Sequence, residues 1–203
     1  MKFRTVPRIL FTNFPAGLAK FRDFVYNKSR ERYTEIFMTE KYESRLRGVY
    51  ENETLGAALR CLSYAAVGLT VYACFYLLLT RLSESPWLAL KLAVILAVPF
   101  VLVTVLRRLL NFPRPYEVLD FYENKPKKKK GCSFPSRHAS SAFSIGTLML
   151  FYLPTFGMGV LAGAVVLCVC RVLLGIHFPR DVVAGGAIGV AGALIGQFLI
   201  TLI

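Results

Sequence analysis

Residues 170–203 read CRVLLGIHFPRDVVAGGAIGVAGALIGQFLITLI, a polar loop followed by an uncharged apolar run from Val182 to Ile203. About 20 apolar residues are enough for a helix to cross the hydrocarbon core of a bilayer. The stretch therefore predicts a transmembrane helix with a histidine-containing loop at the membrane surface. Its glycines follow the spacing that lets membrane helices pack closely, which also allows an oligomer through this span. They are Gly185, Gly189, Gly192 and Gly196.

The composition extends the membrane assignment to the whole chain. Of 203 residues, 55% are hydrophobic, and the mean hydropathy is +0.51 although the formal net charge is +13. A soluble domain of this size needs only about 45–50% apolar residues. The excess predicts an integral membrane protein and excludes a disordered chain, a collagen and a disulfide scaffold.

Four further apolar stretches predict four more helices, so the expected fold is an all-α membrane bundle of about five spans. These stretches cover about residues 57–79, 86–106, 139–153 and 158–175. Residues 57–203 form the predicted membrane domain, and residues 1–56 form a polar N-terminal segment. Within that segment, residues 6–18 suit the lipid headgroup region and residues 29–50 a surface helix. A solvated cytosolic helix fits the segment equally well.

The polar connections differ between the two membrane faces. Residues 107–138 carry nine Lys or Arg side chains, whereas the short opposite connections hold only Arg81 and Glu84 as charges. The positive-inside rule therefore favours the cytoplasmic side for the charged loops, in what we expect to be a bacterial plasma membrane. The lysines at 127–130 are expected to attract anionic lipid headgroups. No nucleic-acid partner is expected.

Three short strings on the charged face place both histidines of the chain next to arginines. They are RRLLNFPRP at 107–115, FPSRHAS at 134–140 and CRVLLGIHFPRD at 170–181, which supply Arg107, Arg114, Ser136, Arg137, His138, Arg171, His177 and Asp181. Taken singly, an arginine at a span end is a common anchor, and Asp181 suits a helix N-cap. Arg171 is harder to explain as an anchor, because a cation inside a span needs a polar partner.

Together these side chains suit a phosphoryl group held without a metal ion. Guanidinium groups bind phosphate oxygens bidentately, and Ser136 with backbone N–H groups at a helix start adds donors. A neutral imidazole attacks phosphorus, while a protonated one donates to the leaving oxygen. A carboxylate four residues after His177 holds its ring in the nucleophilic tautomer. No cofactor is expected, and Glu117, Asp120 and Glu123 are interpreted as a solvated loop face rather than a Mg²⁺ site.

The three strings resemble the signature motifs of the type 2 phosphatidic acid phosphatase family of membrane lipid phosphatases. Those motifs are K-x6-RP, PSGH and SR-x5-H-x3-D, and the likeness covers about residues 57–203. The resemblance implies that His177 is the nucleophile forming a phosphohistidine, Asp181 its orienting group and His138 the general acid. The remaining site residues would bind phosphate: Arg107, Arg114, Ser136, Arg137 and Arg171.

Three positions depart from the family motifs. Arg107 replaces a lysine and keeps the charge, Arg137 replaces a glycine and keeps the backbone N–H, and Cys170 replaces a serine. Family members commonly have six spans, so we expect the N-terminal segment to substitute for the first as an interfacial or re-entrant element. Bacterial relatives usually place the site on the outer face, whereas the charges of this chain favour the cytoplasmic one.

The sequence therefore predicts a metal-independent lipid phosphate or diphosphate phosphatase. The candidate substrates are phosphatidic acid, phosphatidylglycerol phosphate and polyprenyl diphosphates. The alternative is a non-catalytic scaffold or lipid-binding relative of the same fold, against which the intact His138, His177 and Asp181 speak. A transporter is disfavoured because the polar residues gather at one face. A vanadate-dependent haloperoxidase is disfavoured because those relatives are soluble.

Overall fold

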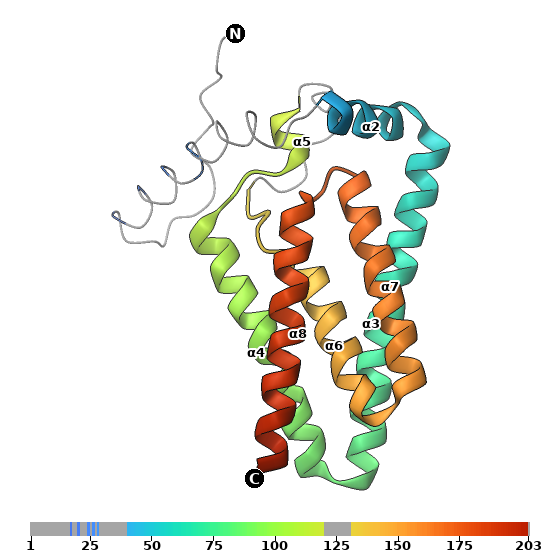
Figure 1. The fold of residues 1–203 in the computed structure, drawn as a ribbon, viewed down its shortest axis with the longest axis vertical. Coiled ribbons are helices and arrows are strands. Elements are labelled where there is room, and N and C mark those ends of the chain that lie inside the picture. Colours follow the sequence, from blue (N-terminus) through green and yellow to red (C-terminus); the bar gives the residue numbers. More distant parts are fainter. Residues whose placement is uncertain are drawn as a thin grey trace.

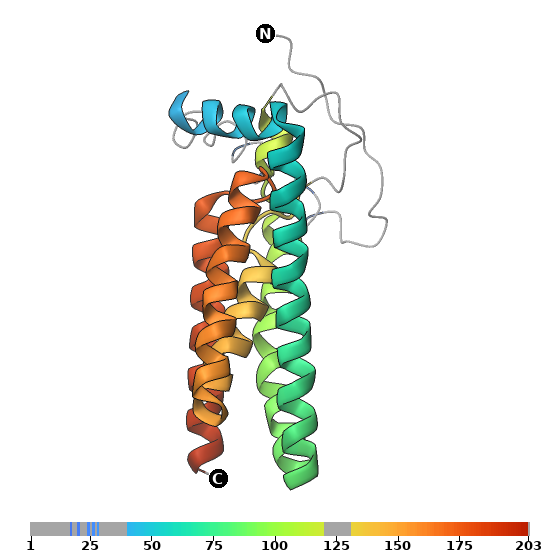
Figure 2. The ribbon, with the colours of Figure 1, turned by 90° about the vertical axis from the view of Figure 1, so that its right-hand side faces the viewer.

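The computed structural model describes residues 17, 20, 24, 26, 28, 40–119 and 131–202. Within the described residues the regular elements are helices: α2 (Glu40–Glu51), α3 (Glu53–Glu84), α4 (Pro86–Leu110), α5 (Pro115–Val118), α6 (Arg137–Tyr152), α7 (Pro154–Leu173) and α8 (Pro179–Leu202). The five long helices α3, α4, α6, α7 and α8 run side by side as a bundle, and α2 lies across one end of it (Figure 1; Figure 2). The predicted all-α bundle is confirmed.

Part of the predicted N-terminal segment lies outside the described residues. Of the proposed headgroup stretch 6–18, all residues but position 17 lie outside the described part of the chain. Helix α2 covers only the second half of the predicted surface helix 29–50. The lysines at 127–130, together with Asp120 and Glu123, also lie outside.

The membrane-crossing helices differ in number from the five predicted spans. In the described part of the chain, α3, α4, α7 and α8 are long and apolar enough to cross a bilayer. The third predicted span is α6, whose 16 residues correspond to about 24 Å, less than a hydrocarbon core of about 30 Å. Nine of its 16 residues are buried, and it contacts all four crossing helices. It is a core helix enclosed by the others.

Short caps set the helix ends that shape the bundle. Ser85 ends α3 and begins α4, its side chain accepting a hydrogen bond from the Leu88 backbone N–H at 3.4 Å, and Pro86 follows as the first helical residue. Proline fits this position because it lacks the backbone N–H, which would have no hydrogen-bond acceptor in the first helical turn. A connection of one residue forces α3 and α4 into a tight antiparallel hairpin.

Glycines in α8 allow it to pack directly against α6. A Cβ atom on Gly185 would lie 2.4 Å from the backbone oxygen of Ser136, and one on Gly189 would lie 2.2 Å from that of Ser140. The other two glycines of the predicted stripe face side chains of α4. The stripe is therefore used within the chain, and an oligomer built through it stays a prediction.

Gly189→Ala is expected to destabilise the bundle, because the added methyl group would force α8 away from the α6 backbone. Overpacking of this kind costs about 1–3 kcal/mol, so the unfolding temperature in detergent should fall. Gly159→Ala in α7 is the matched control, since a Cβ there meets nothing within 4 Å. Equal unfolding temperatures for the two variants would contradict the direct contact between α8 and α6.

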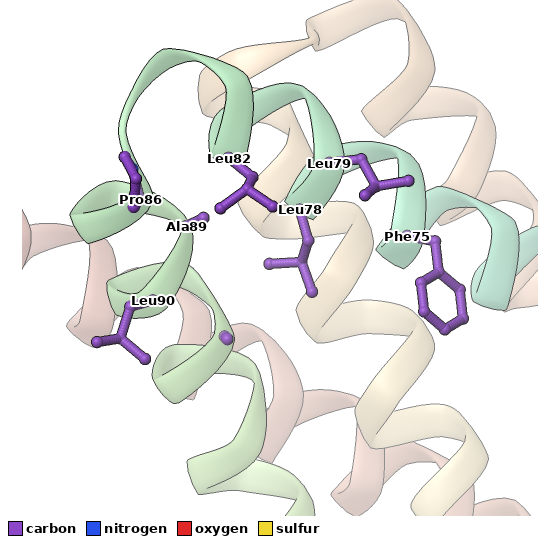
Figure 3. Close-up of a pocket in the computed structure, with 8 residues that line it drawn as sticks. Phe75, Leu78, Leu79, Leu82, Pro86, Ala89 and Leu90 are labelled. Carbon is purple, nitrogen blue, oxygen red and sulfur yellow. The ribbon is translucent and has the colours of Figure 1, made fainter.

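The outer surface of the bundle is apolar along its crossing helices. Trp87, Val183 and Phe198 are among the large side chains exposed there. Many large apolar side chains exposed along the same helices suit acyl chains rather than water. At the end remote from α2, an apolar hollow of about 380 Å³ lies between α3 and α4 (Figure 3). The side chains that line this hollow, among the residues that the structure describes, are all apolar, so it is unsuited to a phosphate group.

Candidate active site

The segments that carry the three sequence strings meet at one end of the bundle. The C-terminus of α4, the N-terminus of α6 and the connection between α7 and α8 lie near the end crossed by α2 (Figure 1; Figure 2). The segment 131–136 descends into the bundle, so α6 begins deeper than the neighbouring end of α8 (Figure 1). The polar groups at the start of α6 are therefore set back from the surface of the bundle.

Electrostatic interactions and one backbone hydrogen bond connect all eight predicted site residues. Three arginines act on His138, one from each string: Arg107, Arg137 and Arg171. The charges of Arg114, Arg107 and Asp181 act on His177. The Ser136 backbone N–H donates to the Asp181 carbonyl oxygen at 2.8 Å. The structure thus brings together the residues that the spacing alone singled out.

The first string is held against the segment that leads into the second. Arg107, in the last turn of α4 and only 6% exposed, donates from Nη2 to the carbonyl oxygen of Cys132. Arg114 donates from Nε to the carbonyl oxygen of Gly131 at 3.0 Å. Each guanidinium has several N–H donors in a fixed fork, so one bond to the backbone orients the group and leaves other donors for a ligand.

Arg171 has a buried donor in the site. Its Nε is buried and has no hydrogen-bond partner among the described residues. A buried polar group without a partner is costly, and a bound oxyanion would satisfy this one. Arg171 lies in the last turn of α7. The cation inside the predicted span is therefore at the end of the helix that faces the site.

Two predicted phosphate-binding residues of the second string, Ser136 and Arg137, also make contacts within the protein. Ser136 is fully buried and caps α6, its Oγ accepting from the Ala139 backbone N–H at 3.5 Å. The Arg137 guanidinium lies 6.0 Å from the ring centroid of Phe100 on α4. The phosphate contacts predicted for these two residues therefore rest on the Ser136 hydroxyl hydrogen and the Arg137 backbone N–H.

His177 and Asp181 lie in an almost fully enclosed polar group. Their exposed fractions are 1% and 0%, and the distance from His177 Nδ1 to Asp181 Oδ2 is 3.6 Å. The same carboxylate oxygen accepts from the Phe178 backbone N–H at 3.0 Å. It also accepts from the hydroxyl group of Ser133, whose Oγ lies 3.4 Å from His177 Nδ1.

Burial lowers the pKa of the His177 imidazole below its usual value, an effect that the Asp181 carboxylate opposes. His177 lies in the loop between α7 and α8, outside the crossing helices. An ordinary histidine titrates near pH 6.5. The ring is therefore neutral at neutral pH, as a nucleophile requires.

Ser133 is a site residue that the sequence analysis missed. It precedes the second string by one residue, and none of the spacings considered includes it. Only the structure identifies Ser133 as part of the site, because it is fully buried and contacts both His177 and Asp181.

The interpretation of Glu117 as part of a solvated loop face is wrong. This half-buried side chain accepts from the Gly131 backbone N–H at 2.6 Å and from the Tyr26 hydroxyl at 2.8 Å. It therefore connects α5 to the segment that enters the second string. Among the described residues no three His, Cys, Asp or Glu side chains form a cluster that could hold a metal ion. Metal independence stays a prediction.

Arg180 is a second residue that the sequence analysis did not single out. Its guanidinium lies 5.0 Å from the ring centroid of Phe112 and 5.3 Å from that of Phe134, and its Nε is 3.7 Å from Asp181 Oδ1. Cation–π contacts of this kind hold aromatic rings against a charged group. Arg180 thus connects the segments around the first and second strings to the first turn of α8.

The fold and the site define an integral membrane protein with an arginine- and histidine-rich oxyanion site at one end of its bundle. The sequence pattern of the PAP2 superfamily matches residues 88–200, more than half of the chain and a range that contains the eight predicted site residues. The chain belongs to this superfamily, which confirms the family indicated by the three motifs.

Three similar proteins place the chain among bacterial relatives. The bacitracin transport permease protein BcrC of Bacillus licheniformis is 29% identical over 131 residues, 64% of this chain and 62% of that protein, so the match spans less than two thirds of the relative. The structure of Aquifex aeolicus LpxE has a TM-score of 0.58 at 26% identity, covering 72% of this chain and 87% of that one.

A transmembrane PAP2-type phosphatidylglycerolphosphate phosphatase from Bacillus subtilis has a TM-score of 0.61. It is 18% identical and covers 92% of this chain and 96% of that one. At this level of identity the likeness shows a shared fold. The four described helices that are long and apolar enough to cross a bilayer, together with membership of the superfamily, identify the protein as an integral membrane protein.

Proposed function

We propose that the protein is a metal-independent phosphatase of lipid phosphates or diphosphates that works through a phosphohistidine on His177. The observation that carries the proposal is the enclosed group of His177, Asp181 and Ser133, with the charges of Arg107 and Arg114 acting on His177 and those of Arg107, Arg137 and Arg171 acting on His138. One of these, Arg171, has a buried donor without a partner among the described residues. Membership of the PAP2 superfamily and the phosphatase of the same fold in Bacillus subtilis support the reaction class.

The first step forms a bond between phosphorus and Nε2 of the neutral His177 ring. The bond from phosphorus to the leaving oxygen breaks, its electron pair goes to that oxygen, and His138 supplies the proton. Burial and the charges of Arg171, Arg107 and Arg137 lower the pKa of His138 to about 3, so its protonated form requires the negative charge of a bound phosphate beside it. His138 Nδ1 is buried without a hydrogen-bond partner among the described residues, which leaves a ring nitrogen for this exchange. The arginines stabilise the charge that develops on the phosphoryl oxygens.

The second step releases phosphate and restores the enzyme. His138, now neutral, takes a proton from a water molecule that attacks phosphorus, and the bond from phosphorus to His177 Nε2 breaks. The same histidine thus serves as acid and then as base, the usual consequence of a covalent intermediate. Asp181 stabilises the positive charge on the His177 ring through its buried contacts.

The substrate is proposed to be a lipid whose phosphate reaches the site while its tails stay in the bilayer. A site at one end of a membrane bundle suits this arrangement, because the apolar helices continue directly below it. The candidates are phosphatidic acid, phosphatidylglycerol phosphate and polyprenyl diphosphates, in a bacterial plasma membrane. The positive-inside rule favours the cytoplasmic face for the site, which labelling of single cysteines at positions 127–130 in intact cells would test.

Purified protein in detergent should release phosphate from at least one of the three candidate lipids. The rate should be the same with EDTA as without it, because the charge stabilisation comes from guanidinium groups. Absence of release from all three lipids would contradict the proposed function. Release that requires added Mg²⁺ would contradict the mechanism.

The rate should depend on pH as expected for a buried neutral nucleophile. Protonation of His177 stops the attack, and burial lowers its pKa, so the acid limb of kcat/KM should lie below about pH 6.5. Asp181→Asn removes the carboxylate that opposes this shift, and the limb should move to still lower pH while the rate falls. An acid limb above the ordinary histidine range would contradict a neutral buried His177.

A further inference from the structure

We infer that Ser133 is a positioning residue that fixes the tautomer of His177 by standing between its ring and Asp181. The inference rests on the proposed function for its catalytic consequence, but the tautomer itself can be measured without any substrate. It assigns the orienting contact to a hydroxyl group that the sequence motifs do not include.

The geometry favours a bridged contact over a direct one. His177 Nδ1 lies 3.4 Å from Ser133 Oγ and 3.6 Å from Asp181 Oδ2, both longer than the usual N–H···O distance of about 2.7–3.2 Å, so the serine oxygen is the nearer acceptor. Asp181 Oδ2 already accepts from two other donors, the Ser133 hydroxyl and the Phe178 backbone N–H. All three residues are at most 1% exposed, so water cannot easily replace the serine in this arrangement.

The direction of these contacts determines which ring nitrogen carries the proton. An ionised carboxylate only accepts hydrogen bonds, and a serine hydroxyl has one hydrogen. Because Ser133 donates that hydrogen to Asp181, its oxygen can only accept a hydrogen bond from His177, through a lone pair. Nδ1 must therefore be the protonated nitrogen, and Nε2 keeps the lone pair that attacks phosphorus.

Backbone contacts hold Ser133 in place for this role. Its N–H donates to the carbonyl oxygen of Phe112 at 2.9 Å. The preceding residue, Cys132, accepts from Arg107 through its carbonyl and donates its N–H to Asn111 Oδ1 at 3.2 Å. The segment that orients the nucleophile is thus the segment that orients a predicted phosphate-binding arginine, so both depend on the end of α4.

The direct test is the protonation state of the His177 ring nitrogens by NMR in detergent. The chain has only two histidines, so labelling histidine nitrogen and comparing with His138→Gln assigns both rings. The expected result for the unmodified protein above its titration range is a proton on Nδ1 of His177. A proton on Nε2 would overturn the inference whatever the enzyme does.

Ser133→Ala should allow both tautomers of His177 and slow formation of the phosphoenzyme. Loss of a hydrogen bond to a charged group corresponds to a decrease in kcat on the order of 10- to 100-fold. The KM should change little, because Ser133 contacts Nδ1 of the ring, whereas the proposed bond to phosphorus forms at Nε2. The assay uses the three candidate lipid phosphates named above. A retained single Nδ1 tautomer with an unchanged rate would overturn the inference.

Ser144→Ala is the matched control. Ser144 is a serine of α6 that is 1% exposed, and its Oγ has no hydrogen-bond partner among the described residues, so the same change should leave tautomer and rate unaltered. In the Asp181→Asn background, Ser133→Ala should add little further loss, since residues that act through one contact are not additive. Fully additive losses would indicate that Ser133 acts independently of Asp181.

The outcomes separate this inference from the proposed function. If His177→Ala retains phosphate release, the proposed mechanism fails, and the NMR result still decides what Ser133 does to the ring. If His177→Ala is inactive while Ser133→Ala matches the unmodified protein in rate and tautomer, the function stands and the positioning role of Ser133 is wrong.

Discussion

His177→Ala should lower phosphate release from every lipid phosphate tested by at least about 10⁴-fold, the scale seen when a covalent nucleophile is removed. The reason is geometric as well as chemical. The ring is enclosed at 1% exposure beside Asp181 and Ser133, so water admitted into the space would have neither the nucleophilicity nor the orientation of Nε2. The measurement is single-turnover phosphate release by purified protein.

A matched control separates loss of chemistry from loss of folding. The His177→Ala variant should elute from a sizing column in detergent as the unmodified protein does. The Ser144→Ala protein, altered at an equally buried position in α6, should retain full activity. Release by His177→Ala at more than a tenth of the normal rate would show that another group attacks phosphorus.

His138→Gln should slow cleavage of a lipid phosphate by about 10²- to 10⁴-fold, the usual contribution of a positioned acid or base. His138 lies in the first turn of α6 among three arginine charges. A lipid alkoxide is a poor leaving group and needs a proton, whereas p-nitrophenolate leaves readily without one. The loss in the phosphoenzyme-forming step should therefore be much smaller with p-nitrophenyl phosphate.

The comparison of the two substrates decides the role of His138. The readout is the initial burst of p-nitrophenol, which reports the first step alone, beside the single-turnover rate for phosphatidic acid. An equal loss for both leaving groups would show that His138 binds phosphate instead of donating a proton. A conserved steady-state rate with the lipid would contradict any role in the chemistry.

The site could be predicted from the sequence because its chemistry is carried by residues at fixed spacing next to span ends. The polar strings at 107–115 and 134–140 lie in one connection between apolar stretches, and two further apolar stretches return the chain to the same face for the string at 170–181. Proximity then follows from topology, and the structure brings all eight residues together. Arg171 was the clearest single signal, since a cation inside a span requires a polar environment.

The remaining features depend on contacts that spacing does not encode. Ser133 acquires its place because the segment 131–136 descends into the bundle beside the ring of His177. Glu117 is identified as a structural connection only once α5 lies against Gly131. Helix α6 resembles a span in composition, yet its 16 residues are enclosed by the crossing helices, an arrangement that hydropathy alone does not reveal.

Trapping the covalent intermediate tests the central claim most directly. In His138→Gln with radiolabelled p-nitrophenyl phosphate, the first step needs no acid but the second lacks its base, so phosphoenzyme should accumulate. We expect a label that survives alkali, is lost in acid as a phosphohistidine is, and maps by mass spectrometry to His177. A label on any other residue, or turnover without a labelled protein, would contradict nucleophilic attack by His177.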